Sequence, residues 1–197
     1  NLTLYNPAKE YETPDDVQNI PHPIIGYMGT INSTRLDGEL LYQIISQRPD
    51  YSFVFTGPED DGFRQHRIHS LKNAYFTGQK KVDELPAYIT AYDVCINPQM
   101  VNDITDGNYP LKIDEYLAMG KPTVATSTHT MCHIFADHTH LATNPEEWLS
   151  AIDRAVTEAD DKELAKQRIA FAETHSWGHS VKKIYDIIDN FLKEKAT

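Results

Sequence analysis

The stretch NYPLKIDEYLAMGKPTVAT, residues 108–126, predicts a helix followed by a short β-branched strand. Pro110 is preorganised for the first helical position, and Gly120 suits the left-handed residue just past a helix end. Lys112 then lies in the first turn, where the positive end of the helix dipole disfavours a cation by roughly 0.3–1 kcal/mol. Because that cost disappears when an anion binds at the same place, this lysine indicates an anion site.

A carboxylate accompanies the lysine on the same helix face. Glu115 follows Lys112 by three residues, a spacing that makes the two side chains neighbours. A helix start, a lysine in its first turn and an adjacent carboxylate together indicate a site for a phosphate linked to a hydroxyl-bearing group such as a sugar.

Outward from this segment, short apolar strands alternate with helical patterns. Strands are predicted at residues 23–29, 52–57, 74–78, 93–98 and 123–126, with a short sixth strand around residue 141. Helices are predicted at residues 36–48, 63–71, 82–91, 110–119, 146–158 and 161–174. This alternation implies an α/β fold, a Rossmann-like doubly wound parallel sheet of about six strands with helices on both faces and a helical C-terminus.

The chain divides into three predicted parts. Residues 1–22 are polar and proline-rich and are typical of a linker; residues 23–176 form the Rossmann-like domain; residues 177–197 form a helix, capped by Ser176, that packs on it. The predicted apolar face of this helix consists of Trp177, Val181, Ile184, Ile188 and Phe191. Since the first residue is Asn rather than Met, we expect a fragment whose natural N-terminal part has been cut away.

The composition limits the partners of the chain. It has 197 residues, 40% of them hydrophobic, and no apolar run approaches the ~20 residues of a membrane span, so a soluble globular protein is expected. The formal net charge of −11 argues against broad nucleic-acid binding. Residues 1–61 hold ten carboxylates but three cations: Lys9, Arg35 and Arg48. An anionic ligand must therefore be met by a few specific cations.

The cysteines and histidines give little sign of a metal site. Cys95 and Cys132 have no C-x-x-C spacing and are typical of reduced, cytosolic residues. Four histidines cluster without an H-E-x-x-H pattern, so a polar loop is the favoured interpretation: His129, His133, His138 and His140. We expect neither a metal nor a cofactor.

The loops that follow the strands are candidates for ligand contact, because parallel sheets bind ligands beyond the carboxyl ends of their strands. Gly29 lets backbone N–H groups approach an anion, and Arg35 either reaches a phosphate or is a surface arginine beside a tight turn. The loop at residues 78–81 either holds a nucleobase or is a solvated turn. The polar loop at residues 101–109 could fold over a ligand.

The order of GYMGTINSTRLD, SFVFTGP, NAYFTG, ELPAYITAYDVCINP and YPLKIDEYLAMGKPTVAT, followed by a terminal HSW helix, resembles the C-terminal half of GT-B glycosyltransferases. The most similar group is the GT4-type enzymes, which include those of bacterial cell-surface polysaccharide synthesis. The resemblance implies a metal-independent hexosyltransferase that uses a nucleotide-diphosphate sugar. It also implies a cytoplasmic location, with peripheral contact to the inner face of the cell membrane through a missing N-terminal domain.

The resemblance assigns roles to the residues that match the family motifs. It implies that Gly29, Thr30 and Arg35 contact the diphosphate, and that Glu115 contacts the ribose. Lys112, within the Pro110–Leu111–Lys112 segment, binds phosphate and, with Arg35, stabilises the leaving group. The loop of Gly78, Gln79 and Lys80 holds the base.

One position departs from the family pattern. The first glutamate of E-x7-E falls at Gly107, so contacts to the donor sugar must come from neighbours such as Asp106 or Asn108.

The resemblance further implies that the acceptor binds in the missing N-terminal domain, toward which the last helix packs, and that this chain binds nucleotide without turning over alone. Two alternatives stay open. One is a GT-B sugar-nucleotide 2-epimerase half. The other is a receiver-type signalling domain of flavodoxin-like topology, although the third strand ends in Thr77 and Gly78 rather than in a phosphorylatable Asp.

Overall fold

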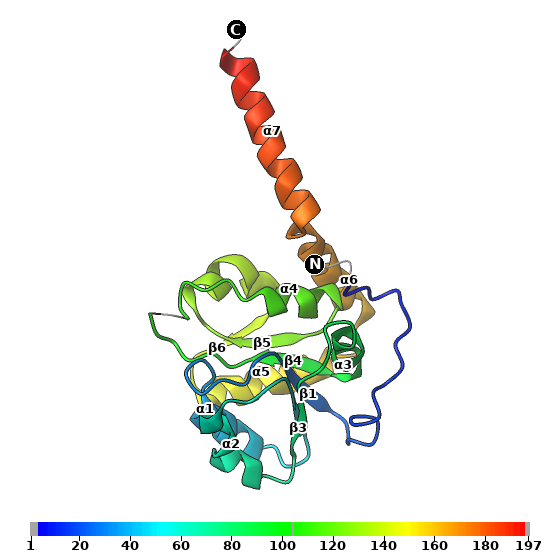
Figure 1. Cartoon of the computed structure of the whole chain (residues 1–197), viewed down its shortest axis with the longest axis vertical. Helices are drawn as coiled ribbons and strands as arrows, with labels where there is room; N and C mark the ends of the chain where they lie inside the picture. The colour runs from blue at the N-terminus through cyan, green and yellow to red at the C-terminus, as the bar shows by residue number, and fades with distance from the viewer. Residues whose placement is uncertain (1–3, 104, 196–197) are drawn as a thin grey trace.

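The computed structural model describes residues 4–103 and 105–195 of the chain. Six parallel strands form one sheet in the order β3-β2-β1-β4-β5-β6 (Figure 1). Their bounds are Ile24–Met28 (β1), Ser52–Thr56 (β2), Ala74–Gly78 (β3), Val94–Asn97 (β4), Thr123–Thr126 (β5) and His140–Ala142 (β6). The predicted sheet of about six parallel strands is confirmed. The order is the Rossmann order, not the 2-1-3-4-5 order of a receiver domain, which removes that alternative.

Helices cover both faces of the sheet, as predicted. Their bounds are Gly38–Ser46 (α1), Asp61–Arg64 (α2), Leu85–Ala91 (α3), Leu111–Ala118 (α4), Pro145–Thr157 (α5), Lys162–Thr174 (α6) and Trp177–Lys195 (α7). The apolar sides of α1 and α5 form one core cluster with one face of the sheet. The second cluster joins the other face to α3 and α4. The doubly wound architecture follows from these two cores.

Three helical segments differ from the sequence prediction. The helix expected at residues 63–71 is split into α2 and a 3-10 helix, Arg67–Ser70. The backbone of His66 is extended, and its side chain caps the second piece by accepting a hydrogen bond from the Ile68 amide. The helix expected from residue 82 begins at Leu85, after a turn in which the Lys81 amide donates to Glu84.

The third difference lies between β5 and β6. The polar loop expected around the histidines is helical, with a π-helical turn at Met131–Phe135 and a 3-10 turn at Ala136–His138. Met131 and Phe135 are buried there, so apolar packing rather than solvation decides the local structure.

The first turn of α4 is fixed to the end of α6. Asp114 is buried, and its carboxylate accepts a hydrogen bond from the Tyr109 hydroxyl at 2.6 Å and lies 2.8 Å from the His175 Nδ1 atom. A buried carboxylate needs such partners. They hold the start of α4, and with it the side chain of Lys112, in a set position relative to the sheet.

Residues 4–22 have few regular elements, yet they lie against the domain. Tyr5, Val17 and Ile20 are buried in the same core cluster as α3 and α4. Asp16 forms an ion pair with Lys80 at 2.6 Å and accepts a hydrogen bond from the Tyr88 hydroxyl at 2.7 Å. This segment therefore forms one side of the corner where β3 leads into α3.

Helix α7 leaves α6 and extends away from the body instead of packing on it (Figure 1). Of its predicted apolar face, Val181, Ile184, Ile188 and Phe191 are 44–57% exposed. The side chain of Trp177 lies outside the described residues. Apolar residues along one side of a helix are typical of a packing surface. Within the described ranges, no helix is both long and apolar enough to cross a membrane.

The centre of β1 provides a test of the packing. A Cβ atom on Gly26 would lie 2.1–2.4 Å from ring atoms of Tyr92, whose hydroxyl is 2.6 Å from the Thr56 Oγ1 atom. We expect Gly26→Ala to lower the free energy of unfolding by about 1–3 kcal/mol, because the buried ring has to shift. Urea unfolding monitored by circular dichroism measures this.

The matched control is Gly107→Ala, where the new methyl group meets nothing within 4 Å. Equal stability of the two variants would contradict the packing described for Tyr92.

Candidate functional site

A pocket of about 420 Å³ lies beyond the carboxyl ends of β1, β2 and β3, next to the first turn of α4. It is lined by Tyr5, Met28, Gly29, Thr30, Thr56, Gly57, Pro58, Gln79, Lys80, Val82, Leu85, Lys112 and Glu115. The strand order reverses between β1 and β4, and open α/β sheets bind ligands at such a point. The volume suits a small-molecule ligand.

Two glycines let the loops after β1 and β2 approach closely. Gly57 has φ +148°, and a Cβ atom there would lie 1.9 Å from the Gly29 carbonyl oxygen. Gly29 has φ +136°, and its Cβ atom would lie 2.8 Å from the Lys112 Nζ atom. A side chain at either position would fill the pocket floor.

The Gly29 amide is not free to face an anion, because it donates to the Thr56 carbonyl at 2.9 Å. The predicted contact between the backbone at Gly29 and a diphosphate stays a prediction. The next amide along, that of Thr30, makes no hydrogen bond to the described part of the chain, and Thr30 lines the pocket.

The Lys112 amine lies next to Gly29 in the lining of the pocket. The side chain is partly buried, and its Nζ atom donates to the Tyr27 hydroxyl at 2.6 Å and lies 3.9 Å from the centre of the Tyr27 ring. Burial lowers the pKa of Lys112 to about 7; the Glu115 carboxylate opposes this shift and the Arg35 guanidinium adds to it. Burial thus favours the neutral amine, and an anion beside it would favour the charged form.

The amino end of helix α4 lies at the pocket, where Lys112 lines it. It begins at Leu111, and Pro110 occupies the cap position without a side-chain hydrogen bond to the first turn. Uncapped amides and the helix dipole both favour negative charge here.

Glu115 lies one turn further along, between Lys112 and the segment at residues 4–22. Burial raises the pKa of the Glu115 carboxyl, while a side-chain hydrogen bond with Tyr5 opposes the rise. Tyr5 thus covers part of the pocket over this carboxylate. The pair offers one hydroxyl and one carboxyl to a ligand that carries hydroxyl groups.

Six of the residues predicted for the site line this pocket: Gly29, Thr30, Gln79, Lys80, Lys112 and Glu115. Gly78 directly precedes Gln79 in the chain, and its carbonyl accepts a hydrogen bond from the Gly57 amide at 3.0 Å. The Lys80 ammonium is directed to Asp16 and lies 5.3 Å from the Tyr88 ring centre. Asp16 therefore neutralises that charge locally.

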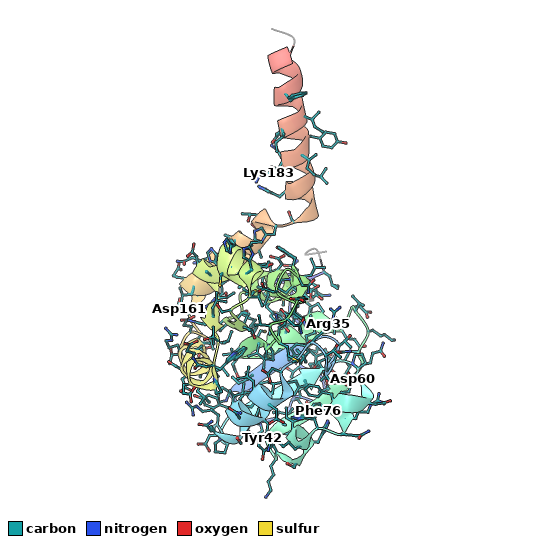
Figure 2. The ribbon with its side chains drawn as sticks, turned by 90° about the vertical axis from the view of Figure 1, so that its left-hand side faces the viewer. Arg35, Tyr42, Asp60, Phe76, Asp161 and Lys183 are labelled. Carbon is teal, nitrogen blue, oxygen red and sulfur yellow. The ribbon has the colours of Figure 1, made fainter. Side chains whose placement is uncertain are left out.

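The other predicted residues lie outside the lining. Arg35, labelled in Figure 2, is exposed. Its charge nevertheless adds to the lowering of the Lys112 pKa by burial and opposes the rise that burial causes in the pKa of Tyr27, so it belongs to the same electrostatic neighbourhood. Leu111 is 67% exposed and Pro110 is buried beneath the helix start.

The polar loop before α4 turns toward a different neighbour. The Asp106 carboxylate accepts a hydrogen bond from the His129 amide at 2.9 Å, and Asn108 is exposed. Residue 104 of this loop lies outside the described residues. A Cβ atom on Gly107 would meet nothing within 4 Å.

Sequence reasoning missed Tyr27 and Tyr5. Strand alternation places Tyr27 in the core, and it is 2% exposed there, but no local pattern reveals that its hydroxyl reaches Lys112. Tyr5 lies in a segment interpreted as a linker. The contact of Tyr27 with Lys112 and that of Tyr5 with Glu115 each join residues more than 80 positions apart.

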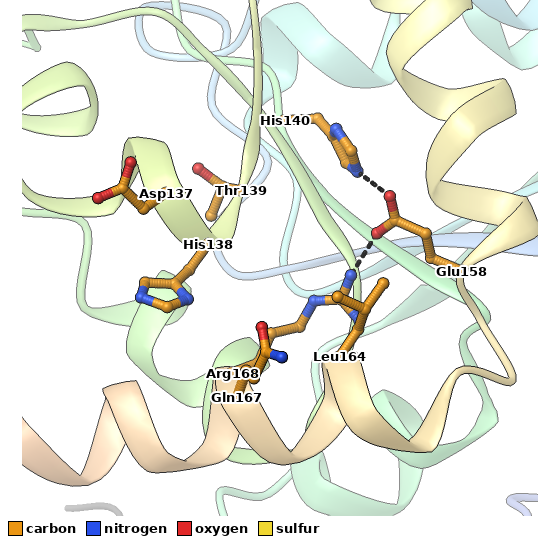
Figure 3. A pocket seen from close by; sticks show the side chains of 8 residues that line it. All are labelled: Asp137, His138, Thr139, His140, Glu158, Leu164, Gln167 and Arg168. Carbon is orange, nitrogen blue, oxygen red and sulfur yellow. Dashed lines mark hydrogen bonds and ion pairs between the residues drawn. The ribbon is translucent and has the colours of Figure 1, made fainter.

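A second cavity, of about 140 Å³, lies between β6, the end of α5 and α6 (Figure 3). Three of the side chains that line it, His140, Glu158 and Arg168, interact with one another. Glu158 binds the buried Arg168 guanidinium and lies 3.0 Å from the His140 Nε2 atom. This network joins β6 to the two helices and has a structural explanation.

The clustered histidines form no evident metal centre in the residues that the structure describes, where no group of three His, Cys, Asp or Glu side chains is placed to hold an ion. His129 and His133, four residues apart, stack with ring centres 4.0 Å apart.

Comparison with known proteins is consistent with this geometry. A model of the family "Glycosyl transferases group 1" matches residues 22–158. The chain is 27% identical over 161 residues to the putative teichuronic acid biosynthesis glycosyltransferase TuaH of Bacillus subtilis, covering 78% of this chain and 40% of that protein.

Solved structures of glycosyltransferases share the fold. Sucrose-phosphate synthase from Thermosynechococcus elongatus superposes with a TM-score of 0.72 at 20% identity, over 98% of this chain and 51% of that one. Anabaena Alr3699/HepE in complex with UDP gives 0.72 at 15% identity, over 96% and 55%. The C-terminal domain of LpcC from Francisella tularensis gives 0.63 at 18%, over 87% and 93%. The chain thus spans under half of the curated relative and about half of the first two structures.

The lowered pKa of Lys112 predicts a pH dependence of stability. Its ordinary pKa is 10.5, so between about pH 7 and 10.5 the unfolded chain binds a proton that the folded chain has lost. The free energy of unfolding should therefore rise with pH in this window, by less than ~1.4 kcal/mol per unit, relative to a Lys112→Met variant. Urea unfolding of both proteins at pH 7, 8.5 and 10 measures the difference. A constant difference would show that the Lys112 amine keeps its ordinary pKa.

Proposed function

Because the chain belongs to the group 1 glycosyltransferases, we propose that its pocket binds the nucleoside diphosphate of a sugar donor. One observation carries this proposal: the Lys112 amine and the Gly29–Thr30 turn meet at the amino end of α4, where the strand order of the sheet reverses. A cation, uncapped helix amides and glycine-lined backbone are the components of a phosphate site. Structures of Alr3699/HepE were solved with UDP and with UDP-glucose, which supports this ligand class.

The charge distribution favours a specific diphosphate contact. With a net charge of −11, the chain lacks a general attraction for anions. Binding then depends on Lys112, on the adjacent charge of Arg35 and on the dipole of α4. A diphosphate raises the pKa of Lys112 above 7, so donor binding is coupled to proton uptake.

The same groups serve the chemistry of transfer. When the glycosidic bond to the diphosphate breaks, negative charge develops on the leaving group. Preorganised charges and hydrogen-bond donors stabilise this charge, and removing one such group typically lowers the rate by ~10²–10³-fold. Lys112 and Arg35 fill this role in the proposed reaction, without a metal ion.

The rest of the nucleotide fits the remaining walls of the pocket. Glu115 accepts hydrogen bonds from the ribose hydroxyls, with Tyr5 beside it, and the backbone at Gln79 and Lys80 faces the base. The Lys80 side chain, paired with Asp16, fixes that loop rather than binding phosphate.

The acceptor belongs to a second half of the enzyme in this proposal. The chain covers 40% of its curated relative, and α7 carries exposed apolar residues. This face packs on the N-terminal half, and the reaction takes place between the halves. The name of the relative supports a role in cell-surface polysaccharide synthesis. The proposal also includes the GT4 type and a location on the cytoplasmic side of the membrane.

Nucleotide binding tests the proposal directly. In isothermal titration, we expect this chain to bind at least one of UDP, GDP and ADP, and Lys112→Ala to weaken that binding by roughly 10–100-fold because a charged hydrogen bond to phosphate is lost. The matched control is Lys72→Ala, an exposed lysine outside the pocket. Equal affinities for the wild type and Lys112→Ala would refute the assignment.

Turnover separates binding from catalysis. We expect this chain alone, given a UDP-sugar, to release no UDP and to interconvert no UDP-sugars, because the acceptor half is required. Release of UDP that depends on an added acceptor would overturn the division of labour between the halves. Interconversion of two UDP-sugars would instead establish the 2-epimerase alternative.

A further inference from the structure

The Tyr27 hydroxyl joins the two parts of the proposed phosphate site. It accepts a hydrogen bond from the Lys112 Nζ atom at 2.6 Å and donates to the Thr30 carbonyl at 3.0 Å. Lys112 comes from α4 and Thr30 from the loop after β1, so a single side chain contacts both. A Cβ atom on Gly29 would lie 3.2 Å from the same hydroxyl oxygen.

The direction of these hydrogen bonds is fixed by chemistry. A phenol has one hydrogen, and a carbonyl can only accept, so that hydrogen goes to Thr30. The lone pairs of the hydroxyl are then left for the amine of Lys112. The arrangement orients Lys112 and the turn at Thr30 together.

We propose that Tyr27 is a positioning residue, whose hydroxyl holds the Lys112 amine at a fixed distance from the Thr30 turn so that both meet one diphosphate. This inference rests on the function proposed above. It adds a residue that touches neither the donor nor the reacting bond and acts through Lys112.

Packing alone does not explain a tyrosine at this position. The ring lies in the core cluster with its centre 6.3 Å from that of Phe55, and a phenylalanine would make the same contacts. The added hydroxyl makes its two hydrogen bonds at the pocket floor. The ring face below the amine also favours the charged form of Lys112.

The groups that face Lys112 determine how readily its amine is protonated, and the test measures this property. They are Tyr27 from β1, Glu115 from the same helix and Arg35 from the β1–α1 connection. Loss of the Tyr27 hydroxyl removes an acceptor from the ammonium and leaves the other two charges unchanged. The protonated form of Lys112 then becomes less favourable.

The test compares Tyr27→Phe with the wild type in titrations with UDP between pH 6 and 9. We expect roughly tenfold weaker binding at pH 7, as for loss of one charged hydrogen bond, and a fall in affinity that begins at lower pH. The matched control is Tyr51→Phe, which removes a hydroxyl that donates to Asp153 at 3.1 Å, away from the pocket. It should leave both the affinity and its pH profile unchanged.

The outcomes are distinguishable. If Lys112→Ala weakens binding as expected while Tyr27→Phe matches the wild type in affinity and pH profile, this inference is overturned and the proposed function stands. If no nucleotide binds, the proposed function fails, and a titration of Lys112 by ¹³C NMR decides on Tyr27. Its pKa should be lower in Tyr27→Phe, and an unchanged pKa overturns the inference.

A further measurement needs no variant, in case Tyr27→Phe does not fold. In the wild type, nuclear Overhauser effects between the Lys112 Hε protons and the Tyr27 ring protons should persist when UDP is added. Their disappearance would show that Lys112 leaves Tyr27 to bind phosphate, which would overturn the positioning role.

Discussion

The amine of Lys112 is withdrawn from water at the point where the strand order reverses, and polar groups around it must make up for the lost hydration. Tyr27 supplies a hydroxyl and a ring face, and Glu115 supplies an opposite charge. The compensation is incomplete, because the pKa of Lys112 still falls to about 7. A site that disfavours its own cation in this way is stabilised when an anion arrives.

The geometry that brings Lys112 to this place depends on several distant contacts. Buried Asp114 holds the first turn of α4 through Tyr109 and His175, and the close approach of Gly57 to Gly29 sets the loops opposite. The segment at residues 4–22 closes a third side through Tyr5 and Asp16. The pocket is thus built by elements that span most of the chain.

Prediction from the sequence succeeded where the signal was local. Hydrophobic periodicity located the six strands, and the helix start at Pro110 located Lys112 and Glu115 beside the strand-end glycine Gly29. It failed where packing between distant residues decides. The helix at residues 63–71 is interrupted at His66, and the segment around the clustered histidines is helical instead of a polar loop.

The sequence by itself determined the parallel α/β architecture and the placing of one lysine at a helix start, because apolar period and helix end signals are properties of neighbouring residues. Only the tertiary structure decided that Tyr27 and Tyr5 reach that lysine and its glutamate, that Asp16 takes the charge of Lys80, and that α7 extends from the body with its apolar residues exposed. These features join positions far apart in the chain, and no local pattern encodes the distance between them.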